Sequence, residues 1–287
     1  MNTTTDTTAL QPTQLPNYSA LVEPVGRVSV NHTVVDRNLP LAVKIRKQIT
    51  QALNDYDMIK DGDRLMICVS GGKDSSILTI LLDDIRKRAE LDFTINAVML
   101  DQKQPGFRAD HFTNWMAAEK IDFKIIEKDT YSIVTDKVKN GVYCSLCSKL
   151  RRAILYDFAF AQKYSKMVLG HHRDDIIETT LLNLFYTGKL STMPAKLLSD
   201  DQRNVVLRPL AYVAEADLIE LAELWSFPVI PCNLCGSQEG MKRKKMKALV
   251  KTLEKDIPNL GSSFITALQN VKPSHLLDDQ LYDFTNF

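Results

Sequence analysis

The sequence lacks the features of a membrane or exported protein. No apolar run approaches the ~18 residues of a membrane span, and residues 1–36 have neither the basic start nor the apolar stretch of a signal peptide. Cysteine is scarce, with five in the chain. We therefore expect a cytoplasmic protein with no membrane partner, in which thiols serve metals or catalysis more often than disulfides.

A strong net charge is also missing. The formal charge is +1 over 287 residues, so any affinity for nucleic acid must come from local patches. There is no internal repeat or low-complexity tract, and 45% apolar with 25% charged residues is typical of a globular chain. We predict a disordered, Thr-rich extension over 1–40, a main domain over 41–230, and a C-terminal region over 231–287.

Short apolar runs alternate with helical patterns in the main domain. The predicted strands are Leu65–Val69, Ile95–Leu100, Phe123–Ile126, Met167–Leu169 and Val205–Leu207. The predicted helices are Ser75–Arg88, Arg108–Lys120, Leu146–Gln162 and Asp174–Tyr186. This alternation predicts an α/β fold with a doubly wound, mostly parallel sheet and a small C-terminal helical appendage. Such sheets bind ligands at the carboxyl ends of their strands.

A glycine loop follows the first predicted strand directly, with the sequence Ser70-Gly71-Gly72-Lys73-Asp74-Ser75. Glycines let the backbone approach a phosphate, and the N–H groups that begin a helix attract an anion. Lys73 adds a positive charge, and the two serines add hydroxyl donors. A Walker A loop is excluded, because Ile67 replaces its first glycine and Asp74 its Ser or Thr. The hexapeptide resembles the PP-loop of ATP pyrophosphatases, with an ordinary strand-to-helix turn as the alternative.

Two further polar segments follow predicted strands. Asp101 or Gln102 could bind a ribose or a purine edge, although a surface turn at Pro105-Gly106 explains the same residues. The segment 170–175 reads Gly-His-His-Arg-Asp-Asp, which suits phosphate and Mg²⁺. We expect His171 and Asp174 to bind the nucleotide, with Asp174 as a helix N-cap as the alternative.

Four of the five cysteines form two pairs of the type Cys-x-x-Cys, at 144–147 and 232–235. Two pairs in a cytosolic chain indicate a metal site more strongly than one. Soft thiolates suit zinc or an iron–sulfur cluster, and the residues by themselves do not decide between them. Cys68 lies inside a predicted strand and is expected to be buried.

Basic residues flank both pairs. Those expected to contact a phosphate backbone are Lys149, Arg151, Arg152, Lys242, Arg243, Lys244 and Lys245. A solvated helix face is the alternative for the second cluster, whose apolar stripe is Met246, Leu249, Val250 and Leu253.

Together these segments resemble the tRNA 2-thiocytidine synthetases, the ATP-dependent tRNA-cytidine(32) 2-sulfurtransferases of bacteria. The matching segments are Ser-Gly-Gly-Lys-Asp-Ser at 70–75, Asp-Gln-Lys-Gln-Pro-Gly-Phe at 101–107, Cys-Ser-Leu-Cys at 144–147, Gly-His-His-Arg-Asp-Asp at 170–175, and Ile-Pro-Cys-Asn-Leu-Cys-Gly-Ser-Gln at 230–238. The resemblance implies a PP-loop ATP pyrophosphatase fold and a [4Fe–4S] cluster held by Cys144, Cys147 and Cys235, with Cys232 a weaker choice for the third ligand.

The resemblance also implies a reaction. ATP and Mg²⁺ would adenylate the C2 oxygen of a cytidine in the tRNA anticodon loop, with Lys73 and Asp74 at the phosphates, and sulfur would then replace that oxygen at the cluster, where Cys235 acts. The sulfur would come from a cysteine desulfurase, and relatives suggest a homodimer. Two alternatives stay open: a zinc-containing relative that uses a protein persulfide, and a non-catalytic, metal-stabilised RNA-binding module.

Overall fold

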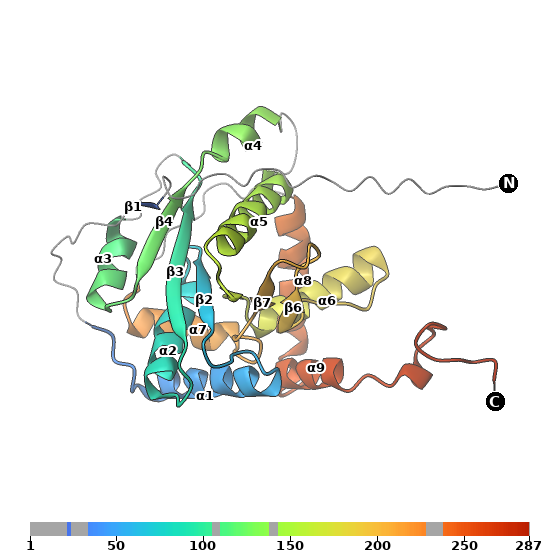
Figure 1. The fold of residues 1–287 in the computed structure, drawn as a ribbon. Helices are drawn as coiled ribbons and strands as arrows, with labels where there is room; N and C mark the ends of the chain where they lie inside the picture. Colours follow the sequence, from blue (N-terminus) through green and yellow to red (C-terminus); the bar gives the residue numbers. More distant parts are fainter. Residues whose placement is uncertain (1–21, 24–33, 105–109, 138–142, 228–237, 287) are drawn as a thin grey trace.

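The computed structural model describes residues 22–23, 34–104, 110–137, 143–227 and 238–286. A seven-stranded sheet runs through this part of the chain (Figure 1). Its five parallel strands lie in the order β4 (Phe123–Glu127), β3 (Thr94–Asp101), β2 (Arg64–Val69), β5 (Lys166–Leu169) and β7 (Val205–Leu207). Antiparallel edge strands are β1 (Val22–Glu23) beside β4 and β6 (Lys196–Leu198) beside β7. The five predicted strands and the mostly parallel sheet are confirmed.

The strand order reverses between β2 and β5. From β2 the chain adds β3 and β4 on one side, and then returns to place β5 and β7 on the other side. Such a reversal opens a crevice at the carboxyl ends of the two central strands, because their connections leave in opposite directions. Residues 70–72 and 170–172 follow these two strands, so both predicted phosphate segments flank the crevice.

Helices cover both faces of the sheet. Leu65, Ile67 and Val69 of β2 enter one hydrophobic cluster, whereas Met66 and Cys68 enter another. The first cluster contains residues of α1 (Pro40–Asp55), α2 (Lys73–Arg88), α3 (Asp110–Ala118) and α7 (Glu215–Leu224). The second is covered by α5 (Tyr143–Ala161), which follows the short helix α4 (Tyr131–Lys137). The alternation of side chains along β2 thus builds the doubly wound arrangement.

Cys68 confirms its prediction as a buried strand residue. Its side chain lies in the second cluster, and burial raises the pKa of its thiol to about 12. The thiol therefore stays protonated and behaves as an apolar group.

The described end of the N-terminal segment packs against the main domain. Val35 is buried, and its N–H donates to Glu119 Oε1 at 2.8 Å. Arg37 pairs with Asp83 of α2 at 3.2 Å and with Glu119 at 2.9 Å. The prediction of a disordered extension is therefore wrong for residues 34–40. Residues 1–21 and 24–33 lie outside the described part of the chain.

The predicted C-terminal helices rest on the main domain through α6 (Arg173–Thr187). Ile177 and Leu181 of α6 form a small cluster with Met246 and Val250 of α8 (Gln238–Leu253). The helix α9 (Leu260–Gln269) packs beside them, and a 3₁₀ turn, η2 (Pro273–His275), follows. Among the described helices, none is long and apolar enough to cross a bilayer.

Candidate nucleotide and thiolate site

The loop after β2 is braced by its own hydroxyl groups. Gly71 has φ +81°, a conformation that only glycine adopts without strain. The N–H of Ser70 donates to Ser75 Oγ at 3.1 Å, and the N–H of Gly72 donates to Ser70 Oγ at 3.3 Å. Ser76 Oγ donates to the carbonyl of Gly72 at 2.8 Å. The serines predicted to bind phosphate therefore also fix the turn that presents the backbone.

The start of α2 is open to a ligand. Gly72 is the N-cap residue, and within the described part of the chain no side chain caps this helix. The first N–H groups of a helix have no intrahelical partners and carry partial positive charge. Lys73 is part-buried here, with its Nζ 3.0 Å from Asp74 Oδ1. A glycine turn, free N–H groups and an ammonium group together form an anion site.

The loop after β5 touches this site through a glycine. A Cβ at Gly170 would lie 2.8 Å from Ser75 N and 2.9 Å from Ser75 Cα. Only a residue without a side chain permits this approach, because the opposing atoms belong to the backbone of α2. The structure thus brings together two segments that are 95 residues apart in the sequence.

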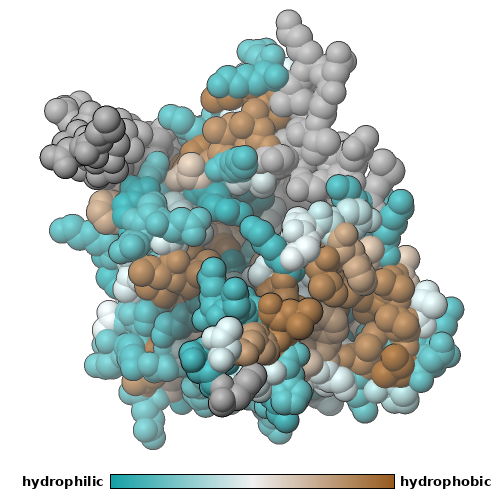
Figure 2. Space-filling view, turned by 90° about the vertical axis from the view of Figure 1, so that its right-hand side faces the viewer, coloured by the Kyte–Doolittle hydropathy of each residue, from teal (hydrophilic) through white to brown (hydrophobic). Residues whose placement is uncertain are grey.

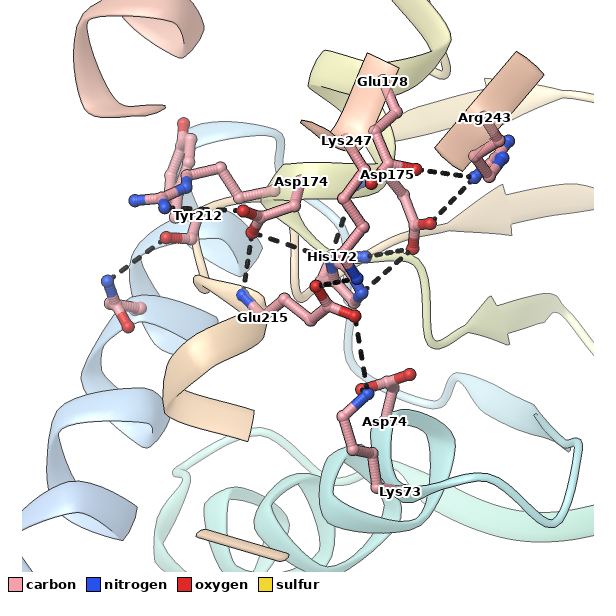
Figure 3. A network of polar contacts seen from close by, with 12 residues as sticks. Lys73, Asp74, His172, Asp174, Asp175, Glu178, Tyr212, Glu215, Arg243 and Lys247 are labelled. Atoms are coloured by element: carbon pink, nitrogen blue, oxygen red, sulfur yellow. Dashed lines mark hydrogen bonds and ion pairs between the residues drawn. The ribbon is translucent and has the colours of Figure 1, made fainter. Parts of the chain in front are cut away.

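His172, and not Asp174, caps α6. The N–H of Asp175 donates to His172 Nδ1 at 3.4 Å, and the N–H of His172 donates to Asp175 Oδ2 at 3.2 Å. Asp174 instead accepts a hydrogen bond from the N–H of Glu215 at 2.7 Å (Figure 3). The alternative of Asp174 as the N-cap is therefore wrong, and Asp174 joins α6 to the start of α7.

Glu215 links the phosphate loop to the C-terminal helices. Its Oε1 lies 3.9 Å from Lys73 Nζ, and its Oε2 lies 2.5 Å from Lys247 Nζ of α8 (Figure 3). Burial disfavours the ionised carboxylate, but the hydrogen bond and charge of Lys247 outweigh burial and hold the pKa of Glu215 below its usual value. The sequence analysis missed Glu215, since nothing near it in the sequence marks its partners.

Arg243 occupies a position beside carboxylates of α6. Its Nη1 lies 3.0 Å from Asp175 Oδ1 and 3.5 Å from Glu178 Oε2 (Figure 3). Glu178 is buried, and burial raises its pKa although Arg243 opposes that shift. Arg243 was predicted to face RNA phosphates, and in the structure carboxylates hold it instead.

The other predicted RNA contacts differ in exposure. Lys244 and Lys245 are exposed on α8, and Lys242 Nζ lies 4.7 Å from the ring centroid of Tyr186. On α5, Lys149 and Arg152 are exposed. Arg151 is half-buried, and its charge opposes the rise in the pKa of Cys68 near the end of β2.

His171 is neutral in the folded protein. Burial lowers its pKa to about 4, and the nearby carboxylate of Asp175 only partly offsets this. Its buried Nδ1 has no hydrogen-bond partner among the described residues. A neutral imidazole at His171 can therefore offer a ligand a hydrogen bond but no positive charge.

The carboxyl end of β3 contacts the first cysteine pair. Gln102 Nε2 donates to Cys147 Sγ at 3.1 Å. Asp101, the residue predicted to bind nucleotide, accepts a hydrogen bond from the N–H of Lys103 at 2.7 Å. The side chain of Cys144, and all of Pro105, Gly106, Cys232 and Cys235, lie outside what the structure describes.

Cys147 is the predicted thiolate ligand whose side chain the structure describes. Positions 144 and 147 are the second and fifth residues of α5, three residues apart and so on one side of the helix. A helix N-terminus favours the thiolate form, and Cys147 is only partly buried. Among the described side chains, no three His, Cys, Asp or Glu groups are placed to hold a metal ion. The soft donor at Cys147 nevertheless fits a thiolate-bound group that is completed by other cysteines.

Comparisons with known proteins agree with this architecture. The family model for the PP-loop domain matches residues 41–227, so fold and loop define a PP-loop protein. The solved U34-tRNA thiolase NcsA from Methanococcus maripaludis, with its [4Fe–4S] cluster, has the same fold. Its TM-score is 0.64 at 21% identity, over 81% of this chain and 80% of that chain.

Curated relatives narrow the assignment. A tRNA-cytidine(32) 2-sulfurtransferase from Bdellovibrio bacteriovorus is 59% identical over 254 residues, covering 88% of this chain and 98% of the relative. One from Methylococcus capsulatus is 52% identical over 245 residues, covering 85% of each chain. The chain therefore belongs to the tRNA-cytidine(32) 2-sulfurtransferase family, a family of enzymes.

Proposed function

We propose that the protein uses ATP to replace the C2 oxygen of cytidine 32 in tRNA by sulfur. The main supporting observation is that an anion-binding loop and a cysteine side chain lie at the ends of two neighbouring strands. The anion loop follows β2, and Gln102 at the end of the adjacent strand β3 contacts Cys147. The names of relatives that match nearly all of this chain support the substrate.

The residues of the loop have distinct roles in this proposal. Lys73 and the first N–H groups of α2 would neutralise and orient the phosphates of ATP. Asp74 and Asp174 would supply carboxylate oxygens to the Mg²⁺ that accompanies ATP. The cytidine C2 oxygen attacks the α-phosphorus, and the bond from that phosphorus to pyrophosphate breaks. Oxygen is a poor leaving group, but it departs with AMP when sulfur bonds to C2.

The cysteines would hold a [4Fe–4S] cluster. Cys144, Cys147 and Cys235 are the proposed ligands, with Cys232 as the weaker choice for the third position. When bound, a cluster with three protein ligands keeps one iron open for an exogenous sulfide, as catalytic metal sites keep a vacant position. The cluster in the structural neighbour supports this choice over zinc.

Exposed basic residues support tRNA as the substrate. Lys149, Arg152, Lys244 and Lys245 offer phosphate contacts for tRNA, whose unpaired loop bases can be splayed out.

We further propose a cysteine desulfurase as the sulfur source, a cytoplasmic location and a homodimer. We retain the division into a PP-loop domain over 41–230 and a region over 231–287.

Anaerobic reconstitution tests the proposal. Protein loaded with iron and sulfide should thiolate cytidine 32 of tRNA only when ATP is present, and should release pyrophosphate. The C144S/C147S variant should lose the visible absorption of the cluster and the thiolation together. Zinc without charge-transfer absorption would favour the persulfide alternative, and tRNA binding indifferent to ATP and to K73M would favour the RNA-binding module.

A further inference from the structure

An apolar surface forms at the far end of α6. We call it the α6 patch, and its residues are Leu184, Phe185, Tyr186 and Leu190, with exposed fractions of 44%, 58%, 45% and 58%. This end of α6 projects from the side of the molecule that faces the viewer in Figure 2, where apolar side chains gather. Several large exposed apolar residues gathered at one end of a helix mark an interaction site more often than single ones.

The α6 patch is fixed in shape. Gly188 ends α6 with φ +64°, and Asn183 Nδ2 then donates to the carbonyl of Ser191 at 2.9 Å and to its Oγ at 3.1 Å. The loop that carries Leu190 is thereby held against the helix. A partner would bind here without having to order the surface first.

A second apolar surface lies at the C-terminus. Residues 271–286, which we call the C-terminal arm, lead away from the body beyond α9 (Figure 1). Leu277 is fully exposed, Leu281 is 57% exposed and Phe284 is 37% exposed. Three large apolar side chains in one short segment are costly to leave in water, at roughly 1.5–3 kcal/mol each.

The arm has local structure even though these side chains are exposed. Asp278 Oδ1 accepts from the N–H of Gln280 at 2.9 Å, and Asp283 Oδ1 accepts from the N–H of Thr285 at 2.8 Å. The rings of Tyr282 and Phe284 stand 5.0 Å apart, edge to face. The arm therefore presents a preformed apolar surface.

The two surfaces carry opposite charge. The arm contains three acidic residues, Asp278, Asp279 and Asp283, and one lysine, Lys272. At the patch, Lys189 is exposed, and Lys242 lies over the Tyr186 ring. Acidic groups with apolar anchors thus match an apolar surface with basic neighbours.

We propose that the arm of one copy docks on the α6 patch of a second copy. The arm and the far end of α6 project from the same side of the molecule (Figure 1), so a two-fold axis can exchange both arms at once and close the assembly. This inference rests on the homodimer within the proposed function, and it assigns the contact that forms that dimer.

Sedimentation of the full-length holoenzyme with matched variants tests this. We expect the wild type to be dimeric at about 10 μM, and L277D/L281D in the arm or F185D/L190D in the patch to raise the dissociation constant on the order of 100-fold. The control L91D/L224D alters leucines that are 44% and 56% exposed elsewhere, and should stay dimeric.

Cross-linking separates the outcomes further. A benzophenone amino acid at position 281 should form a covalent dimer whose cross-linked peptide contains residues 184–190 of the other chain. A dimer unaffected by both variant pairs would overturn the docking but not the homodimer. A monomeric wild type would overturn both. A cross-link within one chain would overturn only the docking, and neither result would bear on thiolation. Loss of tRNA affinity in F185D/L190D with dimerisation intact would assign the patch to RNA and also overturn the docking.

Discussion

The phosphate loop and helix α8 meet at one crevice, but different forces hold them there. The loop is fixed by hydroxyl hydrogen bonds and by the contact of Gly170 with the backbone at Ser75. Helix α8 is fixed by a small apolar cluster and by ion pairs of Arg243 and Lys247. Close packing does not respond to salt or pH, whereas part-exposed ion pairs do. The loop after β2 should therefore be rigid, whereas the attachment of α8 should weaken as salt or pH changes.

The largest effect should come from removing the loop ammonium. In K73M, pyrophosphate release and thiolation should fall about 10²–10³-fold, because a preorganised charge at the phosphates is lost. The melting temperature should change little, since Lys73 is the first residue of α2 and its side chain is part-exposed. The control K60M changes an exposed lysine and should keep activity within a factor of about two. Equal activity in K73M and K60M would exclude ATP from this loop.

Substitution of Gly170 should disrupt the close packing between the loop after β5 and the start of α2. In G170A, the new Cβ would meet backbone atoms of Ser75 that cannot rotate away, so the free energy of unfolding should fall by about 3 kcal/mol. Urea unfolding and ATP titration measure the change. The control G188A alters a positive-φ glycine with open space around it, and should cost stability while leaving ATP affinity unchanged. Unimpaired ATP affinity in G170A would contradict a packed site.

The buried imidazole of His171 predicts that the free energy of unfolding depends on pH. Its folded pKa of about 4 lies below the unfolded value of about 6.5, so the unfolded chain binds the proton first as pH falls. Stability should therefore decrease by about 2 kcal/mol between pH 7.5 and pH 5. H171Q should remove most of this slope in urea midpoints, and H275Q, at an exposed histidine, should not. An unchanged slope in H171Q would show that His171 is not buried in its neutral form.

Removal of Arg243 should have the smallest effect and should depend on conditions. R243M leaves the buried Glu178, whose folded pKa is already raised, without its cation. The pKa of Glu178 should rise further, so the loss of stability should reach about 1 kcal/mol at pH 8 and vanish below about pH 4.5, where the unfolded Glu178 is protonated too. High salt should reduce the difference in the free energy of unfolding between R243M and the wild type, because it screens the ion pair that the wild type keeps. K244M, at an exposed lysine, is the control; an equal pH-dependent loss there would contradict the pairing.

Sequence reasoning reached the parallel sheet because its strands are apolar runs separated by helical patterns. It missed β1 and β6, which have two and three residues and therefore carry almost no periodic signal. It expected residues 34–40 to be disordered, because the composition of residues 1–40 does not reveal that Arg37 finds two carboxylates in the main domain.

Within the site, the loop and the segment 170–175 were predictable, because each follows a strand and the strand order brings them together. Their internal contacts were not. Asp174 looked like a helix cap, but His172 caps α6 and frees Asp174 to join α7. Gln102 gave no sign of its contact with Cys147, 45 residues away. Side-chain partners from distant elements depend on how helices pack, which local patterns do not encode.

The sequence by itself determined the fold class, the glycine loop and the family to which the chain belongs. These follow from local chemistry: which residues permit a glycine turn, begin a helix or bind soft metals. Only the tertiary structure decided which charges face the site. It turned Arg243 and Lys247 toward carboxylates and made Glu215 the link from the loop to α8. The reason is physical, since a buried carboxylate must find a cation wherever the fold brings one near.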